Sequence, residues 1–445
     1  MCVPEIDLKW SSSVDEGAIT HCCPSLGGFQ RSLRRLILNK QFLVFVFAVF
    51  LWSCSLCSGQ SALSATEAVN FALSHRPELR AANDHVIGSE RLRTQAGLIP
   101  NPRFLFRKED LRPQTSAFGD SSQTYWEGEQ LVEISGKRGG RIAVANQSIE
   151  QRRLEVDLDR RQIALNVRES YWKAKAIQAL AALYDENARY FRQVIDYHEA
   201  RFKEGKLAEV DLLRVRLQGQ QIQAAASNGR LDSEKAILML AQEMNAAPNP
   251  AWVLSDDLET LEEPRSMPPG SDASALRTEA QIAKQSIAQA KARTQLERAN
   301  GRPDLLFTGG YKRDIDLDSP VAGVQFDIPL FNRNQGAVAA SRADEEAASE
   351  TYQATRNRLA AELTLAQREY EMRREQYLQV FKPLRNQAVE ISDISRTAYQ
   401  AGGLDLLRLL DAERARVDAQ LSYVRALEGF HLSVAALNYA EGMDQ

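Results

Sequence analysis

The chain has 445 residues, of which 44% are hydrophobic and 26% charged, and its net charge at pH 7 is −4. A weakly acidic chain without a basic stripe and interleaved aromatic residues is not expected to attract nucleic acid. Aromatic residues make up only 7%, and long stretches rich in Ala, Gln, Arg, Leu and Glu are typical of long or coiled helices.

The first sixty residues differ from the rest of the chain. Basic residues precede the apolar run FLVFVFAVFLW (Phe42 to Trp52), and small residues follow it as far as Gly59. This order is that of a secretory signal, so residues 1–59 are predicted to be a leader. The run is too short to span a bilayer as a helix, and a short membrane anchor or a buried helix is the alternative. Residues 1–30 are interpreted as the product of a start codon assigned too far upstream.

All cysteines of the chain lie in this leader: Cys2, Cys22, Cys23, Cys54 and Cys57. Cleavage near Gly59 and Gln60 leaves a mature chain without thiols, so neither disulfides nor thiolate metal ligands are expected. Alternatively, LWSC (Leu51 to Cys54) resembles a bacterial lipoprotein cleavage box, although Trp52 is bulky for it. That alternative predicts lipidation of Cys54.

After the leader, a helix is predicted from Ser64 or Thr66 to about Gly97, with Pro77 either kinking it or absorbed near its start. Two strands, Ile99 to Phe106 and Thr124 to Ile134, follow on either side of a loop. The next helix, from about Arg141 to Phe202, is roughly 90 Å long at 1.5 Å per residue, so it requires a partner along its length. The turn Phe202 to Glu209 supplies one by returning the chain as a helix from Val210 to about Met244.

A heptad run in the long helix predicts the seam along which it packs. Leu158, Leu165, Trp172 and Ala179 are seven residues apart, and the run then steps to Leu183, Tyr190 and Tyr197. A single amphipathic helix on a globular core is the alternative, and its length argues against it.

The acidic, Pro-rich segment 248–271 breaks this pattern and is predicted to be a linker or an equatorial layer. The same order of elements then begins again. The predicted elements are a helix from Asp272 to Ala299, strands Asp304 to Tyr311 and Ala322 to Leu330, a helix from Gly336 to Thr397, a turn at Ala398 to Leu407, and a helix to about Tyr439.

Three blocks of the two halves align at similar offsets. DIPLFNRNQG (Asp327 to Gly336) matches VEISGKRGGR (Val132 to Arg141) at an offset of 195, the turns match at 197, and Arg277 falls on Arg76 at 201. Agreement of three blocks in order indicates a tandem repeat, with residues 62–247 as the first unit and 272–442 as the second.

The strands carry a signal for a membrane. Val324, Phe326 and Ile328 alternate with Gln325 and Asp327, as expected of a strand between lipid and a water-filled lumen, although an ordinary half-buried strand shows the same alternation. In the second strand Trp126, Val132 and Ile134 share a face, whereas the repeat alignment places Leu131 there, and a bulge would reconcile the two. Four strands cannot close a barrel, and lipid requires every backbone polar group to be paired, so several copies are needed.

With this plan, residues 62–442 resemble the TolC family of outer-membrane efflux channels, and DIPLFNRNQG and ISGKRGGR are similar to motifs of its CzcC-like heavy-metal subgroup. The resemblance implies a mainly α fold with a membrane β part. Four strands from each subunit of a homotrimer would complete one outer-membrane β-barrel, which a long α-helical barrel continues through the periplasm. It further implies a passive exit duct of a tripartite efflux system of the heavy-metal RND type, without cofactor or metal site, that binds a periplasmic adaptor and an inner-membrane pump.

The family receives its adaptor at two helical turns on the periplasmic tip. The positions that match are Glu204, Gly205, Lys206 and Leu207 in the first half, and Ala401, Gly402, Gly403 and Leu404 in the second. Glycine permits the left-handed conformation that a helix hairpin needs, and leucine offers an apolar side chain to a partner helix.

Family channels often close with inward acidic residues nine and twelve positions after the aromatic residue of the turn. Counted from Phe202 and Tyr399, the matching positions are Asp211, Arg214, Arg408 and Asp411. This mixture predicts closure by Asp–Arg pairs between neighbouring helices in place of an acidic ring, and solvated surface pairs are the alternative.

Sequence motifs of enzymes are missing. The histidines after the leader, His75, His85, His198 and His431, are scattered, and no HExxH, phosphate loop, nucleophile elbow or GxGxxG occurs. Within the same fold, a duct for drugs or for type I protein secretion is the alternative function. A periplasmic coiled-coil scaffold without a pore is the alternative of another class.

Overall fold

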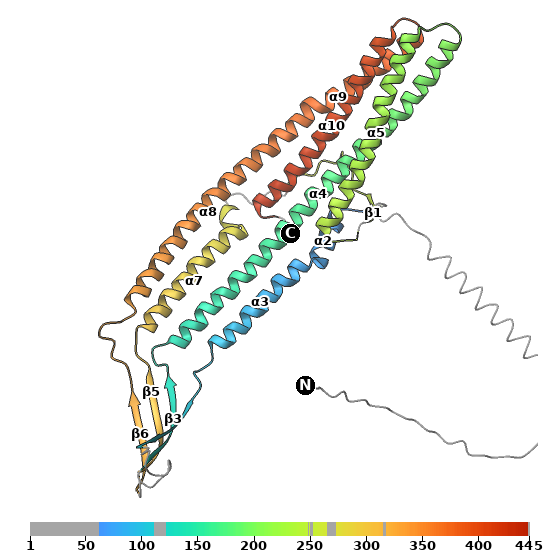
Figure 1. Ribbon diagram of the computed structural model, residues 1–445. Coiled ribbons are helices and arrows are strands. Elements are labelled where there is room, and N and C mark those ends of the chain that lie inside the picture. The colour runs from blue at the N-terminus through green and yellow to red at the C-terminus, as the bar shows by residue number, and fades with distance from the viewer. Residues whose placement is uncertain are drawn as a thin grey trace, which may run out of the picture. The chain divides into compact units, whose positions relative to one another are not determined.

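Long helices lie side by side, with strands at one end and two helical turns at the other (Figure 1). The computed structural model describes residues 62–110, 122–247, 249, 252–264, 273–314 and 317–443, all within the unit Ser61–Gln445. The predicted leader, including Cys54 with its possible lipidation, lies outside the described residues.

The first half follows the predicted order of elements. They are β1 (Ala62–Leu63), α2 (Ala65–His75), α3 (Pro77–Ala96), β2 (Arg103–Glu109), β3 (Gln123–Val132), α4 (Lys137–Lys203) and α5 (Glu209–Met244). Ser64 caps α2, as predicted, because its side chain accepts a hydrogen bond from Glu67 N while the Glu67 carboxylate accepts one from Ser64 N. The first predicted helix is divided at Arg76, which is extended (ψ 124°) because the following proline disfavours the helical region.

The second half adds its own elements: β4 (Val253–Leu254), α6 (Ala273–Leu276), α7 (Thr278–Asn300), β5 (Leu305–Asp314), β6 (Leu317–Gln325), α8 (Gln335–Gln376), α9 (Lys382–Gln400) and α10 (Leu406–Glu441). The helix predicted to run unbroken from Gly336 to Thr397 contains a π-helical turn, Tyr377–Phe381, directly before Pro383. Proline has no N–H and its ring crowds the carbonyl one turn earlier, so a wider turn at this point relieves both problems.

The sheet is antiparallel throughout, in the order β2-β3-β5-β6. Its register is continuous from Gln123 to Val132 opposite β5, so the bulge considered for the second strand is absent there. The prediction of the last strand was wrong, because β6 ends at Gln325 and the chain from Phe326 to Leu330 leaves the sheet. Pro320 is tolerated inside β6 because an edge strand does not need every backbone N–H for its ladder.

The core lies where α4 packs against α2, α5 and α10, and its fully buried side chains include Tyr171, Leu240, Met244, Leu427 and Phe430. The predicted seam of α4 holds at Trp172, which is buried, but not at Tyr197, which is 47% exposed while its neighbour His198 is buried. Among the described residues, no helix combines the length and the apolar character needed to cross a bilayer.

Candidate functional site

The four-stranded sheet has two chemically different faces. Side chains alternate along each strand, so the register assigns every residue to one face. One face carries apolar and aromatic residues, most of them exposed: Phe104, Phe106, Trp126, Phe307, Tyr311 and Val324. The opposite face carries mostly polar and charged residues: Arg103, Arg107, Tyr125, Glu127, Glu129 and Lys312. This division is expected of a sheet with lipid on one side and water on the other.

Contacts within each face support the assignment. On the apolar face the ring of Trp126 lies 5.9 Å from Phe106 and 5.9 Å from Tyr311, measured between centroids. On the polar face, Arg107 lies 4.6 Å and Lys312 5.3 Å from the ring of Tyr125. Trp126 and Val132 share the apolar face, as predicted, and Leu131 lies on the other one.

Both edges of this sheet are open within the described chain. β2 pairs only with β3, and β6 pairs only with β5, so each presents a row of unpaired backbone groups. An apolar face cannot enter lipid while the edges remain unpaired, because no water is available there to satisfy them. In a bilayer, such a sheet would require partner strands on both sides.

The motif ISGKRGGR connects the sheet to the helices. Arg138 donates to the carbonyl of Gly97, and Arg141 donates to the carbonyls of Ala96 and Leu98 at distances of 3.2 and 3.3 Å. These carbonyls lie at the C-terminal end of α3. The two arginines therefore cap α3 and hold its end against the start of α4.

The motif DIPLFNRNQG forms the second join between the sheet and the helices, and it holds the end of a helix with different side chains. The Asn334 amide donates to the backbone carbonyl of Glu297, near the end of α7, at 2.9 Å. Gly301 allows a close approach, because a Cβ at this position would lie 2.3 Å from the carbonyl oxygen of Arg333. ISGKRGGR and DIPLFNRNQG, the motifs similar to those of the CzcC-like subgroup, thus both connect the sheet to the helices.

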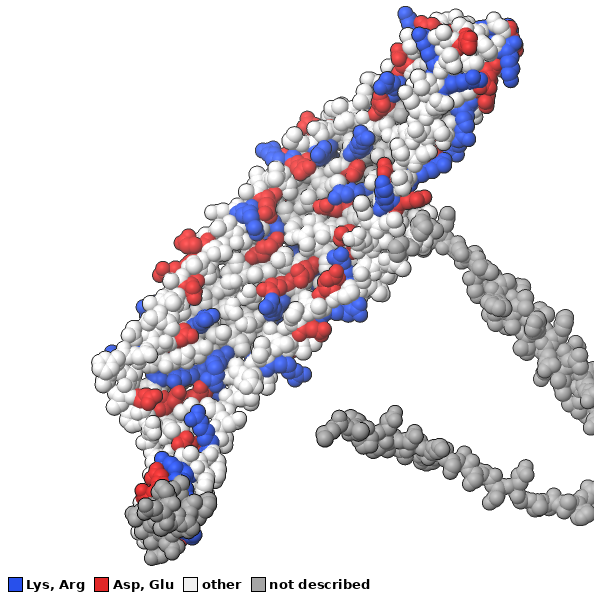
Figure 2. Space-filling model, viewed as in Figure 1, with Lys and Arg blue, Asp and Glu red and all other residues white. Residues whose placement is uncertain are grey.

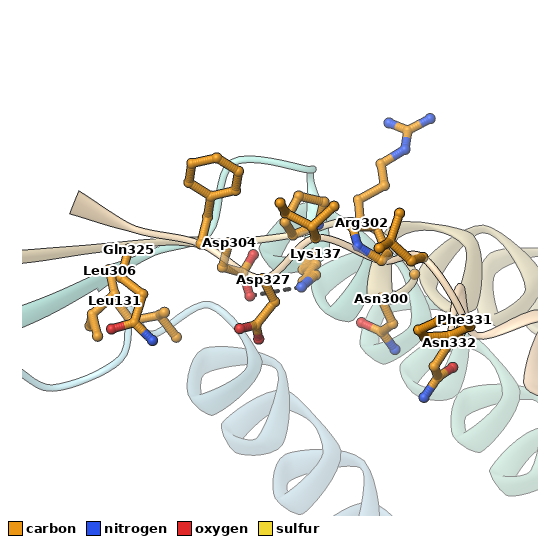
Figure 3. Close-up of a pocket in the computed structure, with 16 residues that line it drawn as sticks. Leu131, Lys137, Asn300, Arg302, Asp304, Leu306, Gln325, Asp327, Phe331 and Asn332 are labelled. Carbon is orange, nitrogen blue, oxygen red and sulfur yellow. Dashed lines mark hydrogen bonds and ion pairs between the residues drawn. The ribbon is translucent and has the colours of Figure 1, made fainter.

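A cavity of about 670 Å³ lies at the second join (Figure 3). Lys137 Nζ and Asp304 Oδ2 are 2.7 Å apart in it, and Asp327 lies beside this pair. Phe331, also in its lining, is 92% exposed. In the part of the chain that the structure describes, no three His, Cys, Asp or Glu side chains are placed to hold a metal ion.

The two helical turns at the far end are built alike. Gly205 and Gly402 have φ values of 71° and 78°, in the left-handed region that favours glycine. Lys206 N donates to Arg201 O, and Gly403 N donates to Ala398 O, each at 2.9 Å, which is the hydrogen bond of a Schellman motif.

Figure 2 shows side chains of both charge signs crowded at this end of the molecule. Lys206 and Glu204 form an exposed pair at 2.9 Å. Leu207 and Leu404, predicted to be available to a partner, are half-buried. The exposed apolar residues lie slightly further along the returning helices: Val210, Leu213, Leu217 and Leu407. The sequence analysis missed these four, although Val210 and Leu407 correspond at the offset of 197.

Of the four predicted aperture residues, Arg214, Arg408 and Asp411 are exposed in the single chain and Asp211 is half-buried. Arg214 pairs with Asp211 at 3.5 Å within α5, and Arg408 pairs with Asp405 at 3.4 Å at the start of α10. Pairs between neighbouring helices at these positions are therefore not formed inside one chain, and the remaining residue, Asp411, is placed on the exposed side of α10.

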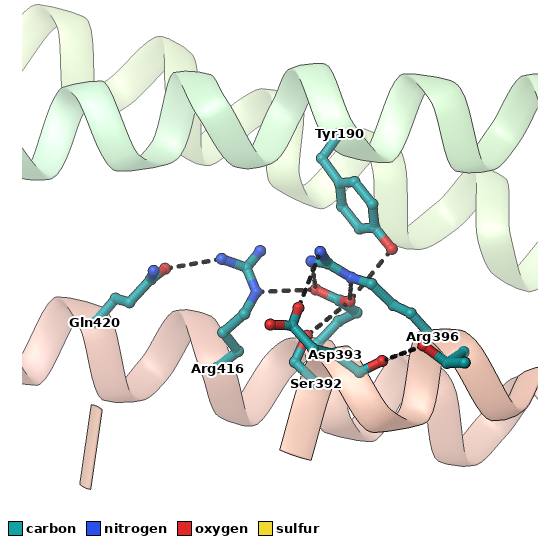
Figure 4. A network of polar contacts seen from close by, with 8 residues as sticks. Tyr190, Ser392, Asp393, Arg396, Arg416 and Gln420 are labelled. Atoms are coloured by element: carbon teal, nitrogen blue, oxygen red, sulfur yellow. Dashed lines mark hydrogen bonds and ion pairs between the residues drawn. The ribbon is translucent and has the colours of Figure 1, made fainter. Parts of the chain in front are cut away.

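A buried polar network near this end was also missed (Figure 4). The carboxylate of Glu413, whose side chain is 2% exposed, accepts hydrogen bonds from Arg396, Arg416, Ser392 and Tyr190. Burial alone would raise the pKa of Glu413, but the hydrogen bonds and charge of Arg396, together with the charge of Arg416, outweigh it and hold the pKa below the ordinary 4.5. Tyr190 comes from α4, so the network also joins the first half to the second.

Comparison with known proteins agrees with this geometry. The family described as "Outer membrane efflux protein" matches residues 271–442. The cobalt-zinc-cadmium resistance protein CzcC of Cupriavidus metallidurans is 25% identical over 374 residues, covering 83% of this chain and 86% of that protein. The nickel-cobalt-cadmium resistance protein NccC of Alcaligenes xylosoxydans xylosoxydans is 27% identical over 271 residues, covering 59% of this chain and 60% of that protein.

Solved structures share the fold. CusC has a TM-score of 0.72 at 16% identity, with 85% of this chain and 91% of that chain covered. The CmeC outer membrane channel of Campylobacter jejuni has a TM-score of 0.72 at 16% identity, with 85% and 86% covered. The fold is therefore that of the TolC-like outer-membrane channels. The match of residues 271–442 to the outer membrane efflux protein family and the similarity to CzcC and NccC support an outer-membrane efflux duct.

Proposed function

We propose that three copies of this chain form the exit duct of a tripartite efflux system in the bacterial outer membrane. The sheet carries the proposal, because it is amphipathic and open at both edges. Joining β6 of each copy to β2 of the next pairs both edges, and it places the apolar faces toward lipid and the polar faces toward a lumen. The helices then continue the duct into the periplasm.

The tip with the two Schellman turns is the proposed docking site for a periplasmic adaptor, which connects the duct to an inner-membrane pump. Its residues are Glu204, Gly205, Lys206 and Leu207 with Ala401, Gly402, Gly403 and Leu404. The support is the exposed apolar set that follows the turns, because apolar side chains on a helix face are what a partner helix buries.

The same tip is the proposed periplasmic aperture. Its residues are Asp211, Arg214, Arg408 and Asp411, of which the last three are exposed in one chain and therefore available to the neighbouring copies of a trimer. Replacing Asp411 with Ala is expected to raise the single-channel conductance in planar bilayers, because a charge at the narrowest point is removed. An unchanged conductance would place the aperture elsewhere.

Heavy-metal cations are the proposed cargo, on the support of the CzcC and NccC relatives. The duct itself has no metal-binding cluster among its described residues, so selection of the cargo belongs to the pump and the adaptor. In a strain that lacks its own CzcC-like duct, expression of this chain should restore resistance to cobalt, zinc or cadmium. Restored export of drugs or of a secreted protein, without metal resistance, would assign the duct to one of those systems instead.

The duct itself is tested with purified protein in detergent. A heat-sensitive trimer that conducts ions in planar bilayers is expected. A nonconducting rod that stays in water without detergent would support the periplasmic scaffold and reject the duct.

Adaptor docking is tested at the exposed apolar residues. Val210→Glu together with Leu407→Glu should abolish metal resistance and cross-linking to the adaptor, while the trimer persists. Leu231→Glu is the matched control, since Leu231 is an exposed leucine of the same helix α5 about 30 Å from Val210 at 1.5 Å per residue. Equal loss in both variants would contradict docking at the tip.

A further inference from the structure

The first described residues are bound firmly to the middle of the helices. β1 pairs in parallel with β4, and Leu63 O accepts hydrogen bonds from Ser255 N at 2.9 Å and from the Tyr171 hydroxyl at 2.9 Å. The same hydroxyl accepts from Asp256 N at 3.2 Å, and the Asp256 carboxylate accepts from Ala65 N at 2.8 Å. We call these five residues the N-terminal clamp. Because Tyr171 is fully buried, the clamp belongs to the core.

The N-terminal clamp is far from the strands. Tyr171 follows the first residue of α4, at the sheet end, by thirty-four residues, which is about 50 Å of helix at 1.5 Å per residue. Helices α2 and α3, which lead from the clamp back to β2, give a similar length, also about 50 Å. Figure 1 shows β1 near the middle of α4, well away from the sheet.

The chain before the clamp is too short to cover this distance. Cys54 is eight residues before Ala62 and can reach about 28 Å from it when the chain is fully extended. Cys57 is five residues from Ala62 and reaches about 18 Å. An acyl chain anchors a protein only when it is buried in the hydrocarbon of the bilayer. Neither cysteine could therefore carry an inserted lipid while the N-terminal clamp and the membrane sheet are both in place.

We infer that the chain is not a lipoprotein and that its leader is removed by hydrolysis of the Gly59–Gln60 peptide bond. The reaction consumes one water and leaves a carboxylate on Gly59 and a free amine on Gln60. Small residues are required one and three positions before such a cleavage site, and Gly59 and Cys57 satisfy this. The inference rests on the proposed function to the extent that the sheet lies in the outer membrane.

Intact-mass spectrometry of the chain purified from the outer-membrane fraction tests the inference. The expected mass is that of residues 60–445 without an acyl group, and it is unchanged in Cys54→Ala. A chain that begins with an acylated Cys54 would overturn the inference. Its presence in that fraction as a heat-sensitive trimer, recorded on the same sample, would leave the proposed function intact, whereas absence from the fraction would count against the function.

Forced lipidation tests the reach argument itself. Two variants carry a lipoprotein leader that ends at Cys54: one keeps residues 55–61, and the other has thirty Gly/Ser residues inserted after Ser61, which lengthens the reach several-fold. The short variant should lose most of its trimer, and the long variant should assemble normally. Equal yields of acylated trimer from both variants would overturn the argument.

Discussion

The two halves of the chain place an ion pair at equivalent positions near the tip, but with opposite polarity. At the offset of 197, Glu199 corresponds to Arg396, and Arg216 corresponds to Glu413. In the first half the pair joins α4 to α5 and is exposed, with Arg216 Nη2 2.7 Å from Glu199 Oε1. In the second half it joins α9 to α10, and its carboxylate is buried with four hydrogen-bond donors. The repeat therefore preserves the location of an ion pair between the two helices of each hairpin, but it preserves neither the order of the charges nor the burial of the carboxylate.

The long helices differ in a second way. α4 runs without interruption for 67 residues, whereas its counterpart is divided by the π-helical turn Tyr377–Phe381 into α8 and α9. The second half therefore contains both the irregular helix and the buried polar network. The network fixes α9, which follows the irregular turn, to α10 and to Tyr190 of α4.

The largest expected effect comes from Glu413→Gln. It leaves Arg396 and Arg416 near the core without their carboxylate, and breaking a buried pair in this way costs about 3 kcal/mol or more of folding free energy. Circular dichroism of the detergent-solubilised trimer should show a clearly lower melting temperature. Glu199→Gln is the matched control in the exposed pair, with an expected loss below about 1 kcal/mol. Similar losses in the two variants would contradict the difference in burial.

Acid should act on the same network. Since the pKa of Glu413 is lowered in the fold, its contribution to stability is complete above the ordinary value of 4.5 and is lost as pH falls through the folded value. The difference in melting temperature between the protein and Glu413→Gln should therefore shrink steadily as pH falls below 4.5. A gap that stays constant down to pH 3 would mean that the carboxylate is not what stabilises the network.

The glycines of the turns should behave alike in both halves. Gly205→Ala and Gly402→Ala each force a side chain into the left-handed region, at a cost of about 1 kcal/mol. Gly403→Ala is the control, because Gly403 follows the turn without a positive φ and has room for a methyl group. Melting curves check the ranking, and a larger effect at Gly403 would contradict the Schellman assignment.

Two buried histidines should make the folding stability depend weakly on pH in the mildly acidic range. Burial lowers the pKa of His198, which hydrogen-bonds Tyr399 at 2.7 Å, and of His431, which stacks on Trp172 with ring centroids 3.7 Å apart. Because the unfolded chain binds these protons more readily, stability is complete above about pH 6.5 and falls as pH drops below it. His198→Asn with His431→Asn should flatten the melting temperature between pH 7 and 5. If the melting temperature of the double variant still falls as steeply between pH 7 and 5, other titratable groups cause the pH dependence.

The smallest effect is expected from exchanging the exposed charges. Glu199→Arg combined with Arg216→Glu reproduces the polarity of the second half, and because the pair is solvated the melting temperature should change by an amount equivalent to less than about 0.5 kcal/mol. Each single substitution should be slightly worse than the pair. A large loss in the double variant would show that the polarity in the first half is fixed by other contacts.

Much of the fold was predictable because repetition and helix patterns are local signals. The glycines at Gly205 and Gly402 marked both turns, and Ser64 marked the start of α2. The start of β6 was predicted too late because Pro320 argues against a strand unless the strand is known to be at an edge. Its end was predicted too late because the alternation of Val324, Phe326 and Ile328 continues beyond Gln325. Glu413 was missed because its burial depends on α9 and α4, which the spacing along α10 does not reveal.

The predicted aperture shows the limit of such reasoning. Counting from Phe202 and Tyr399 located four charged residues, but it could not identify their partners, and within one chain Arg214 and Arg408 pair with residues near them in sequence. Exposure at the turns was equally hard to predict, since Leu207 and Leu404 are half-buried whereas Val210 and Leu407 on the returning helices are exposed. The exposed fraction of a side chain depends on how the hairpin packs.

The central claim is that copies of this chain join edge to edge through β6 and β2. Residues 62–443 contain no cysteine, so a thiol can be placed on each edge strand without background: Leu105→Cys in β2, combined in turn with Ser319→Cys, Val321→Cys or Gly323→Cys in β6, all on the polar face. Leu105→Cys with Thr308→Cys in the inner strand β5 is the control.

Non-reducing gel electrophoresis after oxidation in membranes is the most direct measurement. The account predicts that at least one edge pair forms a covalent trimer that resists boiling and returns to monomer on reduction, while the control pair stays monomeric. If every edge pair remains monomeric, or forms ladders that extend beyond the trimer, the sheets do not close a three-copy barrel.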